Sequence, residues 1–201
     1  MFINTGQSCI AAKRFIVVAS RAEEFTALFV ENVKKQIMGN PLDPQTHVGP
    51  LVRENQLKEL EAQVADAVSK GATILTGGKR WGSAGFFYEP TVIANTKPSM
   101  RVVKEEVFGP VAPIIIAKNE ADAIRLANNS PLGLGASIWT KDQTKAERLA
   151  AQIEAGVIFV NSIVRSDPRM PFGGIKKSGI GRELSSYGIK EFVNVKGVTL
   201  Y

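Results

Sequence analysis

The stretch Ala112-Pro113-Ile114-Ile115-Ile116-Ala117 contains no charged or polar side chain. Its apolar residues are continuous and do not alternate with polar ones, which indicates a strand that is covered on both faces. Strands of this kind belong mainly to parallel sheets that carry helices on both sides. The stretch therefore predicts a buried strand within an α/β fold.

Short apolar stretches and stretches of helical periodicity alternate on both sides of this run. The elements expected before it are a strand at 14–19, a helix at about 21–37, a helix that ends at Gly71, and strands at 72–75 and 88–94. The elements expected after it are a helix from Asn119, a strand at 135–140, a helix between Asp142 and Gly156, a strand at 157–161, a short helix at 188–193 and a terminal strand at 195–201. This alternation predicts an α/β architecture with a largely parallel sheet. No repeat or change of composition marks a boundary, so we expect one domain over residues 1–201.

The composition is that of an ordinary globular chain. Hydrophobic residues make up 44% of the 201 positions and charged residues 22%. The most apolar stretch, 107–117, is interrupted by Pro110 and Pro113 and is shorter than the roughly 18 to 20 residues of a membrane-spanning helix. The first six residues have neither the basic region nor the long apolar region of a secretory signal. We therefore expect neither a membrane partner nor secretion.

The charged residues, the cysteine and the histidine limit which nucleic-acid, disulfide and metal interactions are expected. The 25 Lys and Arg against 19 Asp and Glu give a net charge of +6, but they are scattered as pairs such as Lys34-Lys35. No zinc-finger spacing or RNA-binding motif accompanies them, so we expect no nucleic-acid partner. Cys9 is the only cysteine, which excludes an intrachain disulfide and favours a reducing cytoplasm. With His47 as the only histidine, the chain lacks the ligands of a standard zinc site, and we expect no metal.

Two glycine-containing segments do not match phosphate-binding loops. Gly173-Gly174-Ile175-Lys176-Lys177-Ser178 lacks the glycine immediately before Lys-Ser and the spacing of a Walker loop. Gly133-Leu134-Gly135 lacks the third glycine of a dinucleotide fingerprint. The sequence therefore predicts no phosphate site of either type.

Cys9 follows a polar, glycine-containing segment, Asn4-Thr5-Gly6-Gln7-Ser8. A lone free cysteine is more often a buried structural residue than a nucleophile. A nucleophilic role requires local activation, because an ordinary thiol with a pKa of about 8.5 is only a few per cent thiolate at pH 7. His47 is a formal partner for a Cys-His pair, although it lies in a polar loop at 43–47, where a solvated histidine is the simpler interpretation. The residues alone leave both roles of Cys9 open.

Three segments together resemble the motifs of the aldehyde dehydrogenase superfamily. They are Phe2-Ile3-Asn4-Thr5-Gly6-Gln7-Ser8-Cys9, then Glu105-Glu106-Val107-Phe108-Gly109-Pro110, then Pro171-Phe172-Gly173-Gly174-Ile175-Lys176-Lys177-Ser178-Gly179 with Gly181-Arg182-Glu183. Their order and separations resemble those of the family, and the resemblance spans essentially the whole chain, including 39–50. The stretch 181–194 and the pair Lys176-Lys177 most resemble bacterial succinate-semialdehyde dehydrogenases.

The resemblance implies the three-layer catalytic domain of that family, with a largely parallel sheet and a terminal oligomerisation strand at 195–201 that would make a homo-oligomer. It also implies that Cys9 attacks an aldehyde carbonyl, that a thiohemiacetal and then a thioester form on its sulfur, and that NAD or NADP accepts the hydride. Glu106 matches the residue that binds the nicotinamide ribose, and Phe108 matches the residue that packs near the nicotinamide ring. The positions that match substrate-pocket residues are Ser8, Ile10, Val164 and Ser166.

Two departures from the family pattern affect activity and substrate. The family's dinucleotide-binding domain, general-base glutamate and oxyanion asparagine precede the nucleophile. We therefore expect residues 1–201 to be the C-terminal catalytic-domain portion of such an enzyme and to lack normal turnover alone. Ile3 stands where some semialdehyde-specific relatives carry a basic residue. A carboxylated aldehyde such as succinic semialdehyde would then need another guanidinium, and Arg165 and Arg169 are equally suited to that role or to being solvated loop charges.

Two other functions remain open at this point. Cys9 with His47 or a carboxylate would make a non-redox thiol esterase, in which substitution of His47 removes the activity. A catalytically silent module would instead oligomerise through its terminal strand, and its buried cysteine would react slowly with thiol reagents.

Overall fold

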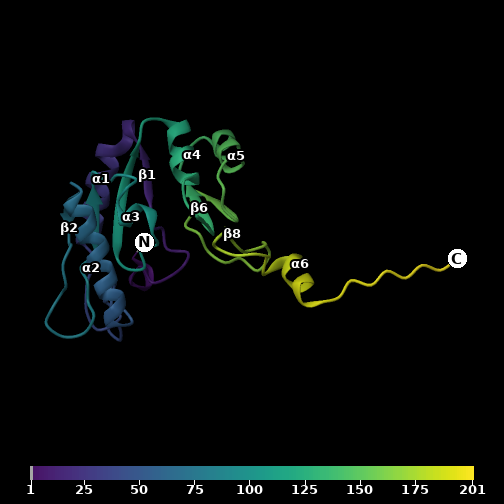
Figure 1. Ribbon diagram of the computed structural model, residues 1–201, viewed down its shortest axis with the longest axis horizontal. Coiled ribbons are helices and arrows are strands. Elements are labelled where there is room, and N and C mark those ends of the chain that lie inside the picture. Colours follow the sequence, from purple (N-terminus) through teal and green to yellow (C-terminus); the bar gives the residue numbers. More distant parts are fainter. Residues whose placement is uncertain (1) are drawn as a thin grey trace. The chain divides into compact units, whose positions relative to one another are not determined.

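A computed structural model describes residues 2–201, which divide into two compact units (Figure 1). The first unit ends at Leu126, and the second extends from Ala127 to Tyr201. We predicted one domain over 1–201, and the division falls inside helix α4 (Glu120–Asn128), where no glycine or proline marks it in the sequence. Within the described residues, no helix combines the length and the apolar character needed to span a bilayer.

The first unit contains a four-stranded sheet with the strand order β1-β4-β3-β2. Its strands are β1 (Phe15–Val18), β2 (Thr73–Thr76), β3 (Thr91–Ala94) and β4 (Val111–Ala117). Strand β4 pairs in parallel with β1 and with β3, and β2 pairs antiparallel with β3. The prediction of a largely parallel sheet is confirmed, and the apolar run that indicated it is β4.

Strand β4 is covered on both faces because its successive side chains enter different apolar clusters. Ile114 packs in a cluster with residues of helix α1 (Ala19–Lys34), whereas Ile115 packs in a cluster with Leu126 of α4. Helix α2 (Glu54–Ser69) lines a third cluster, which includes Leu57, Leu60, Val64, Tyr88, Ile93 and Val107. Ile116 is the exception in the strand and is 52% exposed. The short helix α3 (Arg101–Lys104) lies between β3 and β4 in the chain.

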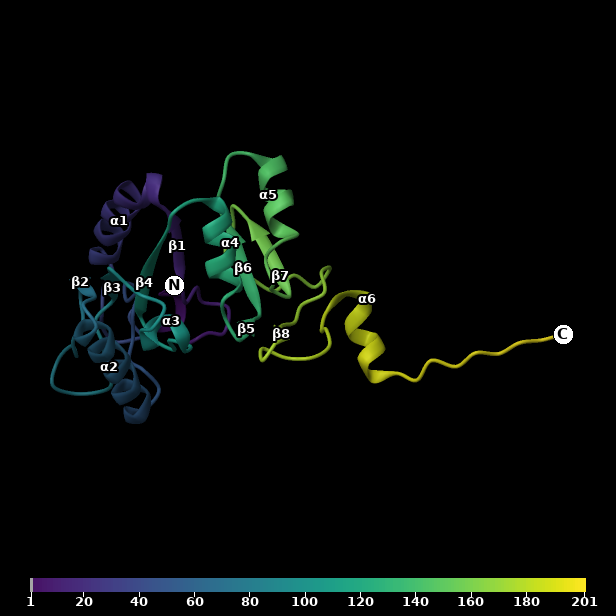
Figure 2. The same cartoon turned by 45° about the horizontal axis from the view of Figure 1, so that its top comes forward.

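The second unit contains two small sheets and is drawn from another direction in Figure 2. Strand β5 (Leu132–Gly133) pairs antiparallel with β8 (Ile175–Lys176), and β6 (Gly135–Ile138) pairs in parallel with β7 (Val157–Val160). Helix α5 (Gln143–Ala150) begins after Asp142, as predicted, and ends before the predicted Gly156; the Asp142 carboxylate caps it by accepting a hydrogen bond from the Lys145 backbone N–H at 2.9 Å. The short helix expected at 188–193 is α6 (Ser185–Gly188) followed by the 3-10 turn η2 (Ile189–Phe192).

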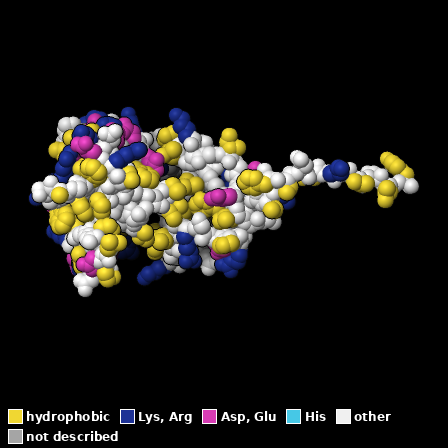
Figure 3. Space-filling view, turned by 90° about the horizontal axis from the view of Figure 1, so that it is seen from below, with side chains coloured by type: hydrophobic (Ala, Val, Ile, Leu, Met, Phe, Trp, Pro, Cys, Tyr) yellow, Lys and Arg dark blue, Asp and Glu magenta, His cyan; other side chains and the backbone are white. Residues whose placement is uncertain are grey.

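The terminal strand expected at 195–201 does not form within the described chain. Residues 194–201 belong to no helix or strand and are exposed, and Figure 3 shows apolar side chains uncovered at the end of this segment. A strand exists only when its backbone groups pair with a neighbour. No described strand pairs with these residues, so the terminal strand that the resemblance assigns to oligomerisation is not formed in the single chain.

Candidate active site

The residues before Cys9 form a tight turn that packs directly on the second motif. Within the 3-10 turn η1 (Ile3–Gly6), Asn4, Thr5 and Gly6 all have left-handed backbone angles, with φ of 52°, 57° and 72°. A Cβ atom at Gly6 would lie only 2.3 Å from the carbonyl oxygen of Gly109. Glycine at this position therefore allows both the backbone angle and the close approach of the two motifs.

The turn is also tied to the segment that follows the first long loop. The buried Thr5 hydroxyl accepts a hydrogen bond from the Gly49 N–H at 3.1 Å and lies 3.3 Å from the Gly49 carbonyl oxygen, to which it donates. The Gln7 amide donates to the Pro50 carbonyl at 3.2 Å and accepts from the Val52 N–H at 2.8 Å. These bonds hold the backbone on both sides of Gly6, and so they fix the path of the chain into Cys9.

Cys9 lies at the surface in a turn, with a free thiol. Ser8 and Ile10, which flank it in the chain and match substrate-pocket positions of the family, are half-buried. The exposure of the thiol rules out the interpretation of Cys9 as a buried structural cysteine. A reagent or substrate can therefore reach its sulfur.

Lys13 connects the turn before Cys9 with the second motif. Its ammonium donates a hydrogen bond to the Gly6 carbonyl at 2.7 Å and lies 4.7 Å from the centre of the Phe108 ring. Burial lowers the pKa of Lys13 from 10.5 to about 8, while the charges of Glu106 and Cys9 act in the opposite direction. The ammonium of Lys13 thus contacts Phe108 and lies within electrostatic reach of Glu106 and Cys9.

The backbone of the second motif is held by two glutamines of helix α2. The Gln56 amide donates to the Phe108 carbonyl at 2.5 Å. The Gln63 amide, which is 3% exposed, donates to the Glu106 carbonyl and to the Glu105 carboxylate, both at 3.2 Å. The two glutamines are seven residues apart, which places them on the same face of the helix.

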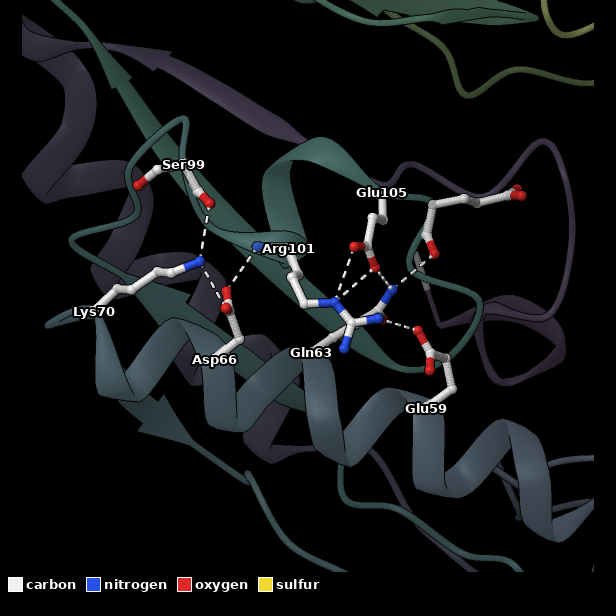
Figure 4. A network of polar contacts seen from close by, with 8 residues as sticks. Glu59, Gln63, Asp66, Lys70, Ser99, Arg101 and Glu105 are labelled. Atoms are coloured by element: carbon white, nitrogen blue, oxygen red, sulfur yellow. Dashed lines mark hydrogen bonds and ion pairs between the residues drawn. The ribbon is translucent and has the colours of Figure 1, made fainter.

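Figure 4 shows the polar network that fixes the chain just before Glu106. The Arg101 guanidinium binds the Glu105 carboxylate at 2.9 and 3.0 Å and also pairs with Glu59. The Arg101 hydrogen bonds are the main reason why the pKa of Glu105 lies below its usual range. At the other end of the network, the Asp66 carboxylate accepts a hydrogen bond from the backbone N–H of Arg101 at 2.9 Å. Glu105 is therefore a structural partner of Arg101, and both Glu105 and the next residue, Glu106, are exposed.

The donors and acceptors around Lys13 fit a nicotinamide nucleotide. The Glu106 carboxylate is exposed and can accept hydrogen bonds from two hydroxyl groups, as the ribose of such a cofactor presents them. The Phe108 ring is 36% exposed, so it still offers apolar surface to a planar ring. Within the residues that the structure describes, no group of three His, Cys, Asp or Glu residues could hold a metal ion.

The remaining predicted site residues belong to the second unit. Val164 is buried against strand β6, since a Cβ atom at Gly135 would lie 3.0 Å from its Cγ1 atom. Ser166 is exposed. Arg169 forms two hydrogen bonds with Asp167, at 3.0 and 2.7 Å, which hold the pKa of Asp167 well below its usual range. Arg165 is exposed and contributes a smaller electrostatic effect to the same carboxylate.

His47 does not act as a partner of Cys9 in this structure. Its Nδ1 atom accepts a hydrogen bond from the Ile37 N–H at 3.1 Å. No hydrogen bond joins His47 to Cys9 in the part of the chain described. The arrangement gives no support to a Cys-His esterase.

Sequence reasoning missed three residues of this site, namely Lys13, Gln56 and Gln63. We counted Lys13 only among the scattered basic residues, and its place two residues before the half-buried strand β1 does not distinguish it from them. The glutamines carried no signal, because a polar residue beside the apolar stripe of a helix is usually solvated.

Three known proteins and one family profile are similar to most of the chain. The aldehyde dehydrogenase family profile matches residues 1–198. A succinate-semialdehyde dehydrogenase of Mycobacterium tuberculosis, whose name specifies NADP(+), is 48% identical over 195 residues, which cover 97% of this chain and 43% of the relative. The succinate semialdehyde dehydrogenase Sad of Escherichia coli, named for NAD(P)+, is 47% identical over 97% of this chain and 42% of its own length. The crystal structure of succinate-semialdehyde dehydrogenase from Burkholderia pseudomallei superposes with a TM-score of 0.92 at 39% identity, over 95% of this chain and 40% of that one.

Proposed function

Because the chain belongs to the aldehyde dehydrogenase family, we propose that it carries the nucleophile and part of the nicotinamide site of an NAD(P)-dependent aldehyde dehydrogenase. The chain spans less than half the length of the relatives named above. The observation that carries the proposal is that Lys13 contacts the partly exposed Phe108 ring and lies within electrostatic reach of the exposed Cys9 and Glu106. The complete activity is proposed for the whole enzyme, of which these residues are the catalytic-domain part.

Cys9 performs the covalent step in this proposal. Its thiolate attacks the aldehyde carbon, and a C–S bond forms while the carbonyl π electrons move to oxygen, which gives a thiohemiacetal. The backbone N–H of Cys9 stabilises the oxyanion, and a donor of this kind is commonly worth about 3 kcal/mol. When bound, the nicotinamide cofactor supplies the acceptor for the hydride that leaves the former aldehyde carbon. Cys9 then carries a thioester, and attack by water releases the carboxylic acid and restores the thiol.

Glu106 and Phe108 hold the cofactor in this proposal. The Glu106 carboxylate binds the ribose hydroxyls, and the Phe108 ring packs near the nicotinamide. Both residues are held in place through the backbone bonds from Gln63 and Gln56. We further propose that the general base and the rest of the dinucleotide site lie in parts of the family fold that correspond to no residue among 1–201.

Succinic semialdehyde is the substrate that the named relatives suggest. We propose that Ser8, Ile10, Val164 and Ser166 correspond to substrate-pocket positions of the family, as the resemblance in sequence implies. For its carboxylate, Arg165 is better suited than Arg169, because Arg169 already binds Asp167 through two hydrogen bonds.

The assembly and compartment are also proposals. The exposed apolar side chains at 195–201 suit a strand that pairs with another copy of the chain, so we propose a homo-oligomer. A nucleophilic thiol must remain reduced, which suits the cytoplasm.

The proposal is tested by NAD(P)H formation with succinic semialdehyde, using wild type and Cys9→Ser. We expect no turnover from residues 1–201 alone, and Cys9-dependent turnover once the N-terminal part of a related dehydrogenase is supplied. Turnover that persists in Cys9→Ser would contradict the covalent role. Ester hydrolysis that is lost in His47→Ala would instead support the esterase.

A further inference from the structure

Lys13 contacts the two motifs of the first unit at once. Its ammonium binds the carbonyl of Gly6, three residues before Cys9, at 2.7 Å. The same ammonium lies over the ring of Phe108, two residues after Glu106, at 4.7 Å. One side chain therefore spans the turn that presents the thiol and the segment that presents the cofactor carboxylate.

The surroundings of Lys13 are costly for a cation. Burial is the largest influence on its pKa and lowers it to about 8, against the opposing charges of Glu106 and Cys9. A methionine would fill similar space without a desolvated charge. An apolar side chain at position 13 would avoid this cost of desolvation. The presence of a lysine there therefore indicates a role for its charge and for the hydrogen bond that it donates.

We propose that Lys13 is a positioning residue, whose ammonium holds the turn at 3–9 against the Phe108 ring and so fixes the Cys9 sulfur relative to the nicotinamide segment. Lys13 forms no covalent bond in this role. The proposal deepens the proposed function and rests on it, because a fixed distance between thiol and cofactor matters only if a hydride passes between them.

Hydrogen exchange of the full 201-residue chain tests the link directly. We compare wild type with Lys13→Met, which keeps the apolar stem, with Lys13→Arg, which keeps the charge, and with Lys34→Met as a matched exposed control. In Lys13→Met, amides in both 2–9 and 105–109 should exchange at least about fivefold faster, the change that about 1 kcal/mol of lost local stability produces. Lys13→Arg should restore slow exchange, and Lys34→Met should match wild type.

Alkylation of Cys9 gives a second readout that a purely structural role would not move. Iodoacetate is an anion and iodoacetamide is neutral. The rate with iodoacetate divided by the rate with iodoacetamide therefore reports positive charge beside the sulfur. The ratio should fall at least about threefold in Lys13→Met and recover in Lys13→Arg, as expected for an ammonium within Coulombic reach of the thiol.

The proposal is overturned if exchange stays slow in either segment of Lys13→Met, or if the reagent ratio is unchanged. If Lys13→Met does not fold, Phe108→Leu tests the same link. This variant removes the ring that Lys13 contacts and leaves the hydrogen bond from Lys13 to the Gly6 carbonyl. Exchange of 2–9 must then accelerate, and unchanged exchange there refutes the link. Neither readout needs aldehyde or cofactor, so these results stay separate from a failure of the proposed oxidation.

Discussion

At the scale of single residues, the half-buried ammonium of Lys13 should make the stability of the first unit depend on pH. Its pKa is 10.5 in an ordinary setting and about 8 in the fold, so between these values the unfolded chain binds more protons than the folded chain. The free energy of unfolding of wild type should therefore rise relative to that of Lys13→Met as the pH increases from 8 to 10. Urea unfolding of both proteins at a series of pH values measures this, and a constant difference would refute it.

Gly6 allows a test of the contact between the two motifs. Gly6 and Gly82 both have φ of 72°, but a Cβ atom at Gly82 would meet no atom within 4 Å, whereas at Gly6 it would meet the Gly109 carbonyl. Gly82→Ala should cost about 1 to 2 kcal/mol of unfolding free energy from backbone strain alone. Gly6→Ala should cost about 1 to 3 kcal/mol more from overpacking. Equal losses in the two variants would show that the close approach to Gly109 is not maintained in solution.

The same residues show which parts of the site are predictable from sequence. The roles of Cys9, Glu106 and Phe108 could be proposed from motif resemblance, because a motif keeps its residues adjacent in the chain. The role of Lys13 was not predicted, because it depends on contacts with Gly6 and Phe108. These two residues are far apart in the sequence, so the sequence does not indicate that one lysine contacts both. The approach of Gly6 to Gly109 was equally hidden, since it joins two motifs about a hundred residues apart.

At the scale of elements, helix α2 should control the second motif through Gln63. Gln63→Leu removes the donor to the Glu106 carbonyl and leaves a polar atom without its bond, which should cost about 1 to 3 kcal/mol of unfolding free energy. Amides at 105–109 should exchange faster as well. The matched control is Gln143→Leu on α5, where the glutamine is exposed and a change within about 0.5 kcal/mol is expected. If both variants lose equal stability, the Gln63 bonds do not hold the motif.

Periodicity predicted the long helices and the parallel strands, because both have apolar faces that repeat in the sequence. It was less reliable at the edges of those faces: in α2, Val64 is 4% exposed, whereas Val68, one turn further on, is 46% exposed. The two-residue strands β5 and β8 were not predicted. So short a ladder is defined by its partner, and two residues carry no periodicity.

At the scale of the whole molecule, the terminal segment carries the last prediction. Val198 and Leu200, which share one face of an extended strand, are 76% and 91% exposed, which a strand in an oligomer would explain by covering them with another copy. A charge introduced on that covered face should therefore break the assembly without affecting the fold of either unit. Val198→Asp should shift the mass measured by light scattering after gel filtration from oligomer to monomer, with an unchanged circular dichroism spectrum. Thr199→Asp makes the same change of charge on the opposite face of the strand and should leave the mass unaltered. A wild-type chain that is already monomeric, or a Val198→Asp variant that remains oligomeric, would show that this segment does not join the subunits.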